Sequence, residues 1–316
     1  MTKTAVVKKN NISDKIKHFF KEANKYKELY LLMIPGLAVL LIFSYGPMYG
    51  LQLAFRNFRI VDGIWGSQWI GLDHFRLMTG HPDFLNAFRN TIIISLNMLL
   101  WGFPAPIILA LLLNELRNAK FKRITQSVLY LPFFLSWVVM AGIIFALFSS
   151  SMGIFNRTLL HMGLETWHII GNPDAFRPLL YSSAIWKGVG WGTIIYMAAI
   201  AGIDQNLYEA SYIDGANRFK QCLYITLPSL KYAIIILLIL NVGGMMNSNF
   251  DQIINLISIS TRPTGDVIDT LVFRMGIEDG RFDVATAIGL FRQSINFVLL
   301  LTANGIVRLL GEEGFL

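Results

Sequence analysis

A run of side chains able to bind hydroxyl groups follows one of the long apolar segments of this 316-residue chain. It includes Asn247, Asn249, Phe250 and Asp251. Amides and a carboxylate form hydrogen bonds with hydroxyl groups, and an aromatic ring packs against the apolar face of a sugar ring. The run therefore indicates either contacts to a ligand or hydrogen bonds between helices. The two interpretations are about equally supported by the sequence.

A second polar position lies inside another apolar segment, where Lys187 is flanked by Trp186 and Trp191. Ionisable residues inside membrane helices usually face a cavity or another helix, because lipid solvates a charge poorly. Lys187 and Trp191 are therefore further candidates for the wall of a cavity. The alternative is that the lysine extends its apolar stem toward the outer membrane interface.

One polar interruption between two apolar segments, residues 204–228, has a pattern suited to docking on a partner. Its spacing predicts two short helices separated by Gly215, which can adopt a left-handed conformation and end the first of them. Pro228 falls where the next apolar segment begins, a position that tolerates proline. A helix, a glycine turn and a second helix, tied to the membrane at both ends, form a unit that can move as a rigid lever. The alternative is an ordinary amphipathic loop.

The usual patterns of catalytic and metal chemistry are missing from the sequence. No stretch fits the Gly-x-x-x-x-Gly-Lys-Ser/Thr pattern of nucleotide-binding loops, so we expect no ATP to bind to this chain. His161 and His168 are seven residues apart without other nearby ligands, which makes a metal site improbable. Cys222 is the single cysteine, so neither a disulfide nor a cysteine metal cluster is expected. We expect no metal, no cofactor and no catalytic residue in this chain.

The composition explains how these residues are positioned. The chain is 54% hydrophobic and 15% charged, whereas soluble domains carry about 25% charged residues. Its length accommodates six spans of about 20 residues with their loops, so we predict an all-α membrane protein. The predicted spans cover residues 29–54, 89–113, 127–148, 178–203, 229–250 and 284–309.

Lys and Arg predict the orientation of these spans. More than half of the 27 basic residues fall in segments that lie on the inner side if the N-terminus is inside, including the cluster from Arg117 to Arg123. We therefore expect a basic inner segment 1–28, a membrane domain 29–310 with the inner loop 204–228, and an inner tail 311–316. The N-terminus lacks the apolar core and cleavage site of a signal peptide, so the first span is expected to remain uncleaved.

The polar loop also carries a motif. Glu209-Ala210-Ser211, three residues, Gly215, nine residues and Ile225-Thr226-Leu227-Pro228 resemble the EAA motif of the permease subunits of ABC importers. Ser211 departs from the pattern by replacing the second alanine. Other stretches resemble sugar-importer permeases, especially those for complex oligosaccharides in Gram-positive bacteria that are related to maltose-importer permeases. These stretches are Trp69–Phe75, Asn90-Thr91, Leu129–Pro132 and Phe250–Ile253.

The resemblance implies a type I ABC importer fold and a bacterial plasma-membrane complex. Its expected parts are a second permease, two cytoplasmic ATPase subunits that bind ATP and Mg, and an extracellular solute-binding lipoprotein. The cargo would be a carbohydrate, and nucleic acid is not expected as a partner. Both termini of the permease would be cytoplasmic, and its membrane-embedded surface would contact lipid.

The resemblance also assigns roles to residues. Glu209 would contact the ATPase, Gly215 would form the bend, and Ala210 and Ser211 would permit close approach. The whole coupling set is Glu209, Ala210, Ser211, Asp214, Gly215, Ile225, Leu227 and Pro228. Because the fifth span lines the cavity in related permeases, substrate contacts are expected at Asn247, Asn249, Phe250 and Asp251, with Trp191 and Lys187 as further candidates.

Two other classes of transporter stay open at this point. An ABC importer for another small solute would share the EAA motif. A secondary transporter that needs no ATPase usually has acidic residues buried in its spans, and the predicted spans of this chain lack them. A membrane-bound enzyme is disfavoured by the missing catalytic residues.

Overall fold

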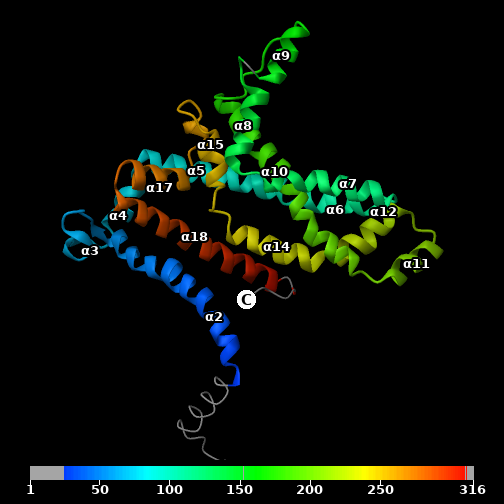
Figure 1. Ribbon diagram of the computed structural model, residues 1–316, viewed down its shortest axis with the longest axis horizontal. Helices are drawn as coiled ribbons and strands as arrows, with labels where there is room; N and C mark the ends of the chain where they lie inside the picture. Colours follow the sequence, from blue (N-terminus) through cyan, green and yellow to red (C-terminus); the bar gives the residue numbers. More distant parts are fainter. Residues whose placement is uncertain (1–24, 152, 310, 312–316) are drawn as a thin grey trace, which may run out of the picture. The chain divides into compact units, whose positions relative to one another are not determined.

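The computed structural model describes residues 25–151, 153–309 and 311. The chain divides into two units, residues 1–52 and 53–316, which are considered separately. The predicted inner segment 1–28 and tail 311–316 lie mostly outside the described residues. A helical stretch begins in the first unit and ends just past its boundary, through α2 (Lys27–Leu40), η1 (Leu41–Tyr45) and η2 (Gly46–Phe55) (Figure 1). This stretch is long and apolar enough to cross a membrane.

The second unit is almost entirely helical, with one two-stranded antiparallel pairing of β1 (Arg56–Asn57) and β2 (Gln68–Trp69). Its first half comprises α3 (Gly63–Gly66), α4 (Asp73–Thr79), α5 (Pro82–Asn97), η3 (Met98–Gly102), α6 (Pro104–Asn114), α7 (Ala119–Tyr130), η4 (Leu131–Phe134), α8 (Trp137–Phe148), α9 (Ile154–His161) and α10 (Pro173–Ala201).

Its second half begins with the polar loop. The elements are α11 (Gln205–Ile213), α12 (Arg218–Gln221), η5 (Cys222–Thr226), α13 (Leu227–Ser229), α14 (Lys231–Gly243), α15 (Phe250–Leu256), α16 (Arg262–Gly265), α17 (Ile268–Phe273), η6 (Arg274–Glu278) and α18 (Phe282–Leu309).

The membrane helices follow the predicted apolar segments. Among the described residues, four continuous helices are long and apolar enough to span a membrane, and two bent pairs bring the number to six if each pair is one span. The continuous helices cover Lys27–Phe55, Pro82–Asn114, Pro173–Ala201 and Phe282–Leu309. The prediction of an all-α membrane protein is therefore confirmed.

The predicted third span, residues 127–148, is not one continuous helix. The helical stretch Ala119–Phe134 and the helix Trp137–Phe148 meet at 105° (Figure 1). Pro132 sits in the last helical turn before the bend, and the Ser136 side chain accepts a hydrogen bond from the Val139 N–H to start α8. A proline followed by an N-cap residue ends one helix and begins another, whatever the hydropathy of the segment.

The predicted fifth span, residues 229–250, is too long at one end. The helix α14 ends at Gly243 and the chain continues without regular helix through Asn249. A side chain at position 243 would collide with Leu300 of α18, so the glycine permits these two helices to pack closely. At its other end, α14 is bent by 58° from the stretch Arg218–Ser229, so Pro228 precedes the bend and does not lie in the first turn of α14.

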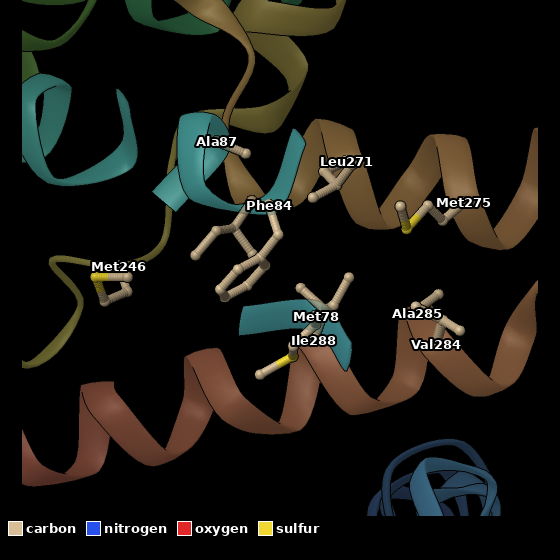
Figure 2. Close-up of a cluster of buried hydrophobic side chains, with 10 residues drawn as sticks. Met78, Phe84, Ala87, Met246, Leu271, Met275, Val284, Ala285 and Ile288 are labelled. Atoms are coloured by element: carbon tan, nitrogen blue, oxygen red, sulfur yellow. The ribbon is translucent and has the colours of Figure 1, made fainter. Parts of the chain in front are cut away.

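Buried side chains join the helices of the second unit in three clusters. The cluster in Figure 2 brings Phe84 of α5, Met78 of α4 and Ile288 of α18 together with residues of α17. A second cluster centres on Phe176 and Leu180 of α10. The third includes Ala110 of α6, Tyr196 of α10 and Leu230, which lies at the start of α14. The second and third clusters include residues that line the cavity described next.

Candidate functional site

A cavity of about 610 Å³ opens among α5, η3, α6, α10, α14 and the irregular segment after α14. Its size falls in the range of about 300–1,000 Å³ that is typical of small-molecule sites. Most of its lining is apolar or glycine, including Gly188 and Gly192 on α10. The polar side chains on its wall are neutral: Ser95, Tyr196, Asn241, Asn247, Ser248, Asn249 and Gln252.

Two of the predicted contact residues, Asn247 and Asn249, line this cavity. The Asn247 carbonyl oxygen accepts a hydrogen bond from Asn296 Nδ2 at 2.8 Å, so its own amide nitrogen is directed elsewhere. The Asn249 side chain is exposed and makes no hydrogen bond within the described part of the chain. Both amides therefore retain hydrogen-bonding capacity for a ligand with hydroxyl groups.

The other two residues of the predicted run do not line the cavity. Phe250 and Asp251 begin α15, where the Phe250 ring packs on Phe273 with centroids 5.4 Å apart and Asp251 is exposed. The role of all four residues in substrate contact stays a prediction.

The irregular segment that bears Asn247 is held by residues that the sequence analysis did not single out. Asn296 of α18 accepts a hydrogen bond from the Met246 N–H at 2.9 Å, in addition to its bond with Asn247. Asp269 of α17 accepts one from the Ser248 N–H at 3.0 Å. Asp269 also forms an ion pair with Arg292 of α18, and both side chains are less than one-fifth exposed.

A signal for these positions exists in the sequence. Arg292 and Asn296 are polar residues four positions apart in the sixth apolar segment, so they share one helix face. Polar residues at such positions are rarely oriented toward lipid. Asp269, the partner of Arg292, is 23 positions upstream of it, and no pattern in the chain predicts that pairing.

Lys187 and Trp191 lie beside the cavity and do not line it. Each precedes a cavity-lining glycine by one residue, which places both on the adjacent face of α10. The Lys187 ammonium donates a hydrogen bond to the Phe133 carbonyl at 2.7 Å, at the bend between η4 and α8. It also lies over the rings of Phe133 and Trp137, and Phe133 stacks on Trp191 with centroids 4.4 Å apart. The role of Lys187 and Trp191 in the pathway stays a prediction.

The polar loop forms the predicted helix, glycine turn and helix. Asp204 caps α11 by accepting from the Asn206 N–H, Gly215 follows the helix with φ +75°, and Asn217 caps α12 by accepting from the Lys220 N–H. A positive φ is readily adopted by glycine and strains most other residues. We call residues 204–229 the coupling unit.

Hydrogen bonds close the coupling unit on itself. Gln221 Nε2 donates to Ser211 Oγ at 2.9 Å and to the Tyr208 carbonyl at 3.3 Å. The Tyr208 hydroxyl forms a hydrogen bond with Thr226 Oγ1 at 2.8 Å. Ser211, which departs from the motif, therefore links the two helices through its hydroxyl, a contact that alanine would not provide.

Some of the predicted coupling residues are exposed and others are partly buried. Glu209, Ala210, Asp214, Gly215 and Pro228 are exposed, whereas Ser211, Ile225 and Leu227 are partly buried. The half-buried Ile225 packs against the third buried cluster.

Apolar side chains are exposed near the turn of the coupling unit. Tyr212, Ile213 and Phe219 are each at least three-quarters exposed, and the sequence analysis did not single them out. An exposed apolar patch beside the acidic residues Glu209 and Asp214 is typical of a surface that contacts another protein.

One ion pair connects the coupling unit to another loop. Arg218 Nη1 lies 3.0 Å from Glu115 Oε2, just after α6, and both side chains are largely exposed. Exposed pairs of this kind contribute little to stability.

Comparison with known proteins identifies the class. Residues 102–311 match the family of binding-protein-dependent transport system inner membrane components, and the chain belongs to this family. It is 42% identical to Protein LplB of Bacillus subtilis over 288 residues, or 91% of each chain. It is 39% identical to the polygalacturonan/rhamnogalacturonan transport system permease protein YteP of the same organism, over 91% of this chain and 90% of that one.

A solved structure has the same fold. A chain of the bacterial alginate ABC transporter, crystallised with an alginate pentasaccharide-bound periplasmic protein, superimposes with a TM-score of 0.85 at 37% identity. The match covers 93% of this chain and 99% of that one. The protein is therefore a membrane-spanning permease subunit of the ABC importer class, with the type I importer fold predicted from the EAA motif. This excludes the membrane-bound enzyme and the ATP-independent secondary transporter.

Proposed function

We propose that this chain is one of two permease subunits that import an acidic oligosaccharide, driven by ATP hydrolysis in separate subunits. The observation that carries the proposal is the position of α14. This 13-residue helix starts at the end of the coupling unit and ends at the segment that lines the cavity. A displacement of the coupling unit is thereby transmitted to Asn247 and Asn249 through one rigid element.

The coupling unit has the features required to contact an ATPase. Its exposed surface combines Glu209 with apolar side chains around a turn that requires glycine, and its two helices are connected by hydrogen bonds. In the proposed complex, ATP and Mg bind to two cytoplasmic ATPase subunits, and closure of these subunits moves the coupling unit. The cavity then alternates between its two accessible states, biased by nucleotide and by the loaded binding protein.

The cavity and the relatives support a carbohydrate with carboxylate groups. The neutral amides on the cavity wall suit hydroxyl groups. Polygalacturonan and alginate, the polymers in the names of two similar proteins, are built from uronic acids. The remaining partners in the proposed assembly are a second, different permease and an extracellular lipoprotein that delivers the sugar. An importer for another small solute of similar size is the alternative.

The proposed location is a bacterial plasma membrane with both termini in the cytoplasm. The distribution of basic residues supports this orientation, because Lys and Arg favour the inner side. It places the coupling unit in the cytoplasm, where ATPase subunits are found.

The test begins with gentle extraction of the chain from its native membrane and mass spectrometry of the proteins that accompany it. The isolated complex is then placed in liposomes, and ATP-dependent uptake of trigalacturonate is compared with uptake of maltotriose and glycerol 3-phosphate. Saturable uptake of the uronate, with a co-purifying ATPase and a second permease, is expected. Isolation of the chain alone, or uptake of glycerol 3-phosphate only, would contradict the proposal.

A variant tests the coupling role. Glu209→Lys combined with Gly215→Pro should leave membrane insertion intact and abolish substrate-stimulated ATP hydrolysis, because proline cannot adopt the φ of +75°. Unchanged stimulation in the assembled complex would show that the coupling unit does not transmit the ATPase motion.

A further inference from the structure

Lys187 lies at the middle of a membrane helix. It is 14 residues from each end of α10, Pro173 and Ala201, which corresponds to about 21 Å along the axis in either direction. The hydrocarbon core of a bilayer is about 30 Å thick, so each half of α10 is longer than half of that core.

The charge of Lys187 has no acidic partner. Within the part of the chain that the structure describes, its ammonium forms no ion pair. Its contacts are the neutral Phe133 carbonyl and the faces of the Phe133 and Trp137 rings, at 5.3 and 5.6 Å. By contrast, Arg292 of the long helix α18 is paired with Asp269. An unpaired cation in a membrane helix costs free energy, and residues of this kind usually mark a functional site.

Not all N–H donors of the Lys187 ammonium are used within the described part of the chain. A lysine carries three N–H donors, and the Phe133 carbonyl accepts one of them. Lys187 and Trp191 adjoin the cavity-lining Gly188 and Gly192 in α10, and the ammonium is directed at Phe133 and Trp137 beside them. The Trp191 ring is 45% exposed, and Phe133 stacks on one of its faces only. A cation next to an open aromatic face complements a sugar ring that bears a carboxylate.

We infer that Lys187 is the residue of this chain that selects a carboxylated sugar, by pairing its ammonium with a uronate carboxylate at the edge of the neutral cavity while Trp191 packs against the ring. This inference rests on the proposed function, since it assumes that a sugar passes through the cavity. It assigns the charge preference to Lys187 and the recognition of hydroxyl groups to the amides on the cavity wall.

The test varies the charge at residue 187 and the charge on the sugar independently. The complex in liposomes is assayed for KM and kcat of uptake with trigalacturonate and with the same trisaccharide after reduction of its carboxylates to alcohols. Lys187→Gln retains a donor for the Phe133 carbonyl and removes the charge, whereas Lys187→Arg retains the charge. Loss of one charged hydrogen bond should raise the KM of Lys187→Gln for the acidic sugar about 10- to 100-fold.

The expected pattern is specific to the charge pair. Lys187→Gln should leave the KM for the reduced sugar unchanged, and Lys187→Arg should resemble the wild type with both sugars. An equal rise of KM for both sugars in Lys187→Gln would mean that Lys187 supports the bend at Phe133. An unchanged KM for both sugars would mean that Lys187 has no role in selection. Either result would overturn the inference about Lys187. Uptake of the acidic sugar by the wild type would still support the proposed function. A wild type that takes up neither sugar would refute both.

If Lys187→Gln fails to assemble, Lys187→His replaces it: the imidazole is charged at low pH and neutral at high pH, so the KM of this variant for the acidic sugar should rise with pH more than that of the wild type, and an unchanged KM would overturn the inference. A second variant, Trp191→Phe, tests the aromatic contact. Trp191→Phe retains an aromatic face of smaller area and should raise the KM for both sugars by a similar small factor. A selective loss of the acidic sugar in Trp191→Phe would contradict the division of roles between the ring and the ammonium.

Discussion

The two ends of α14 are fixed by different kinds of interaction. At the coupling unit, the helices are joined by neutral hydrogen bonds among Tyr208, Ser211, Gln221 and Thr226, and much of the surface is exposed. At the cavity, the chain is held by the amide of Asn296 and by an ion pair that is mostly buried. The difference indicates that one end is built for contact with a partner and the other for a fixed position of the cavity wall.

The largest expected difference in the free energy of unfolding is between variants of the two ion pairs. Asp269→Asn should lower the free energy of unfolding by about 3–5 kcal/mol, because it leaves Arg292 buried without a counter-charge. The matched variant Glu115→Gln removes the partner of Arg218 at the surface and should change stability by less than about 1 kcal/mol. Thermal and denaturant unfolding of the complex in lipid nanodiscs measures both. Similar losses in the two variants would contradict the comparison.

A smaller loss of stability is expected when Asn296 is replaced. Asn296→Ala leaves the buried Met246 N–H without an acceptor, which should cost about 1–3 kcal/mol. Because the same change releases Asn247, the KM for substrate should rise more than kcat falls. Ser294→Ala on the same helix removes a hydroxyl bonded only to the Leu290 carbonyl and serves as the control. A loss of kcat at constant KM would mean that Asn296 does not position the cavity wall.

The smallest effect is expected at Ser211. Ser211→Ala restores the residue of the motif and removes the hydrogen bond from Gln221, at a cost of about 0.5–1.5 kcal/mol. Substrate-stimulated ATP hydrolysis should persist, because the contact surface around Glu209 is unchanged. Gln221→Ala should cost about the same, and the double variant no more than either alone. Additive losses would show that the two residues act independently.

The sequence predicts the features that depend on local patterns. Apolar runs locate the membrane helices, and the spacing of Gly215 locates the turn, because hydropathy and backbone freedom belong to single residues and their neighbours. The bend in the third span was missed because hydropathy carries no information about backbone direction. The direction of the backbone changes because Pro132 ends one helix and Ser136 caps the start of the next.

The cavity is only partly predictable for a related reason. Asn247 and Asn249 were identified from composition, since amides beside an apolar run are conspicuous. Their support by Asn296 and Asp269 depends on which helices adjoin α14, and that arrangement is set by packing such as Gly243 against Leu300. The sequence thus predicted the residues on the cavity wall better than the residues that hold them in place.

The shortness of α14 has an electrical consequence. Thirteen helical residues extend about 20 Å, less than the roughly 30 Å of hydrocarbon, so the helix ends within the membrane next to the cavity. Water that fills the cavity conducts far better than lipid, and nearly all of the membrane voltage therefore falls across whichever side is closed. For an anionic cargo, each charge entering a cell with a negative interior costs about 2.3 kcal/mol per 100 mV. That work is therefore done where the cargo crosses the closed side of the permease.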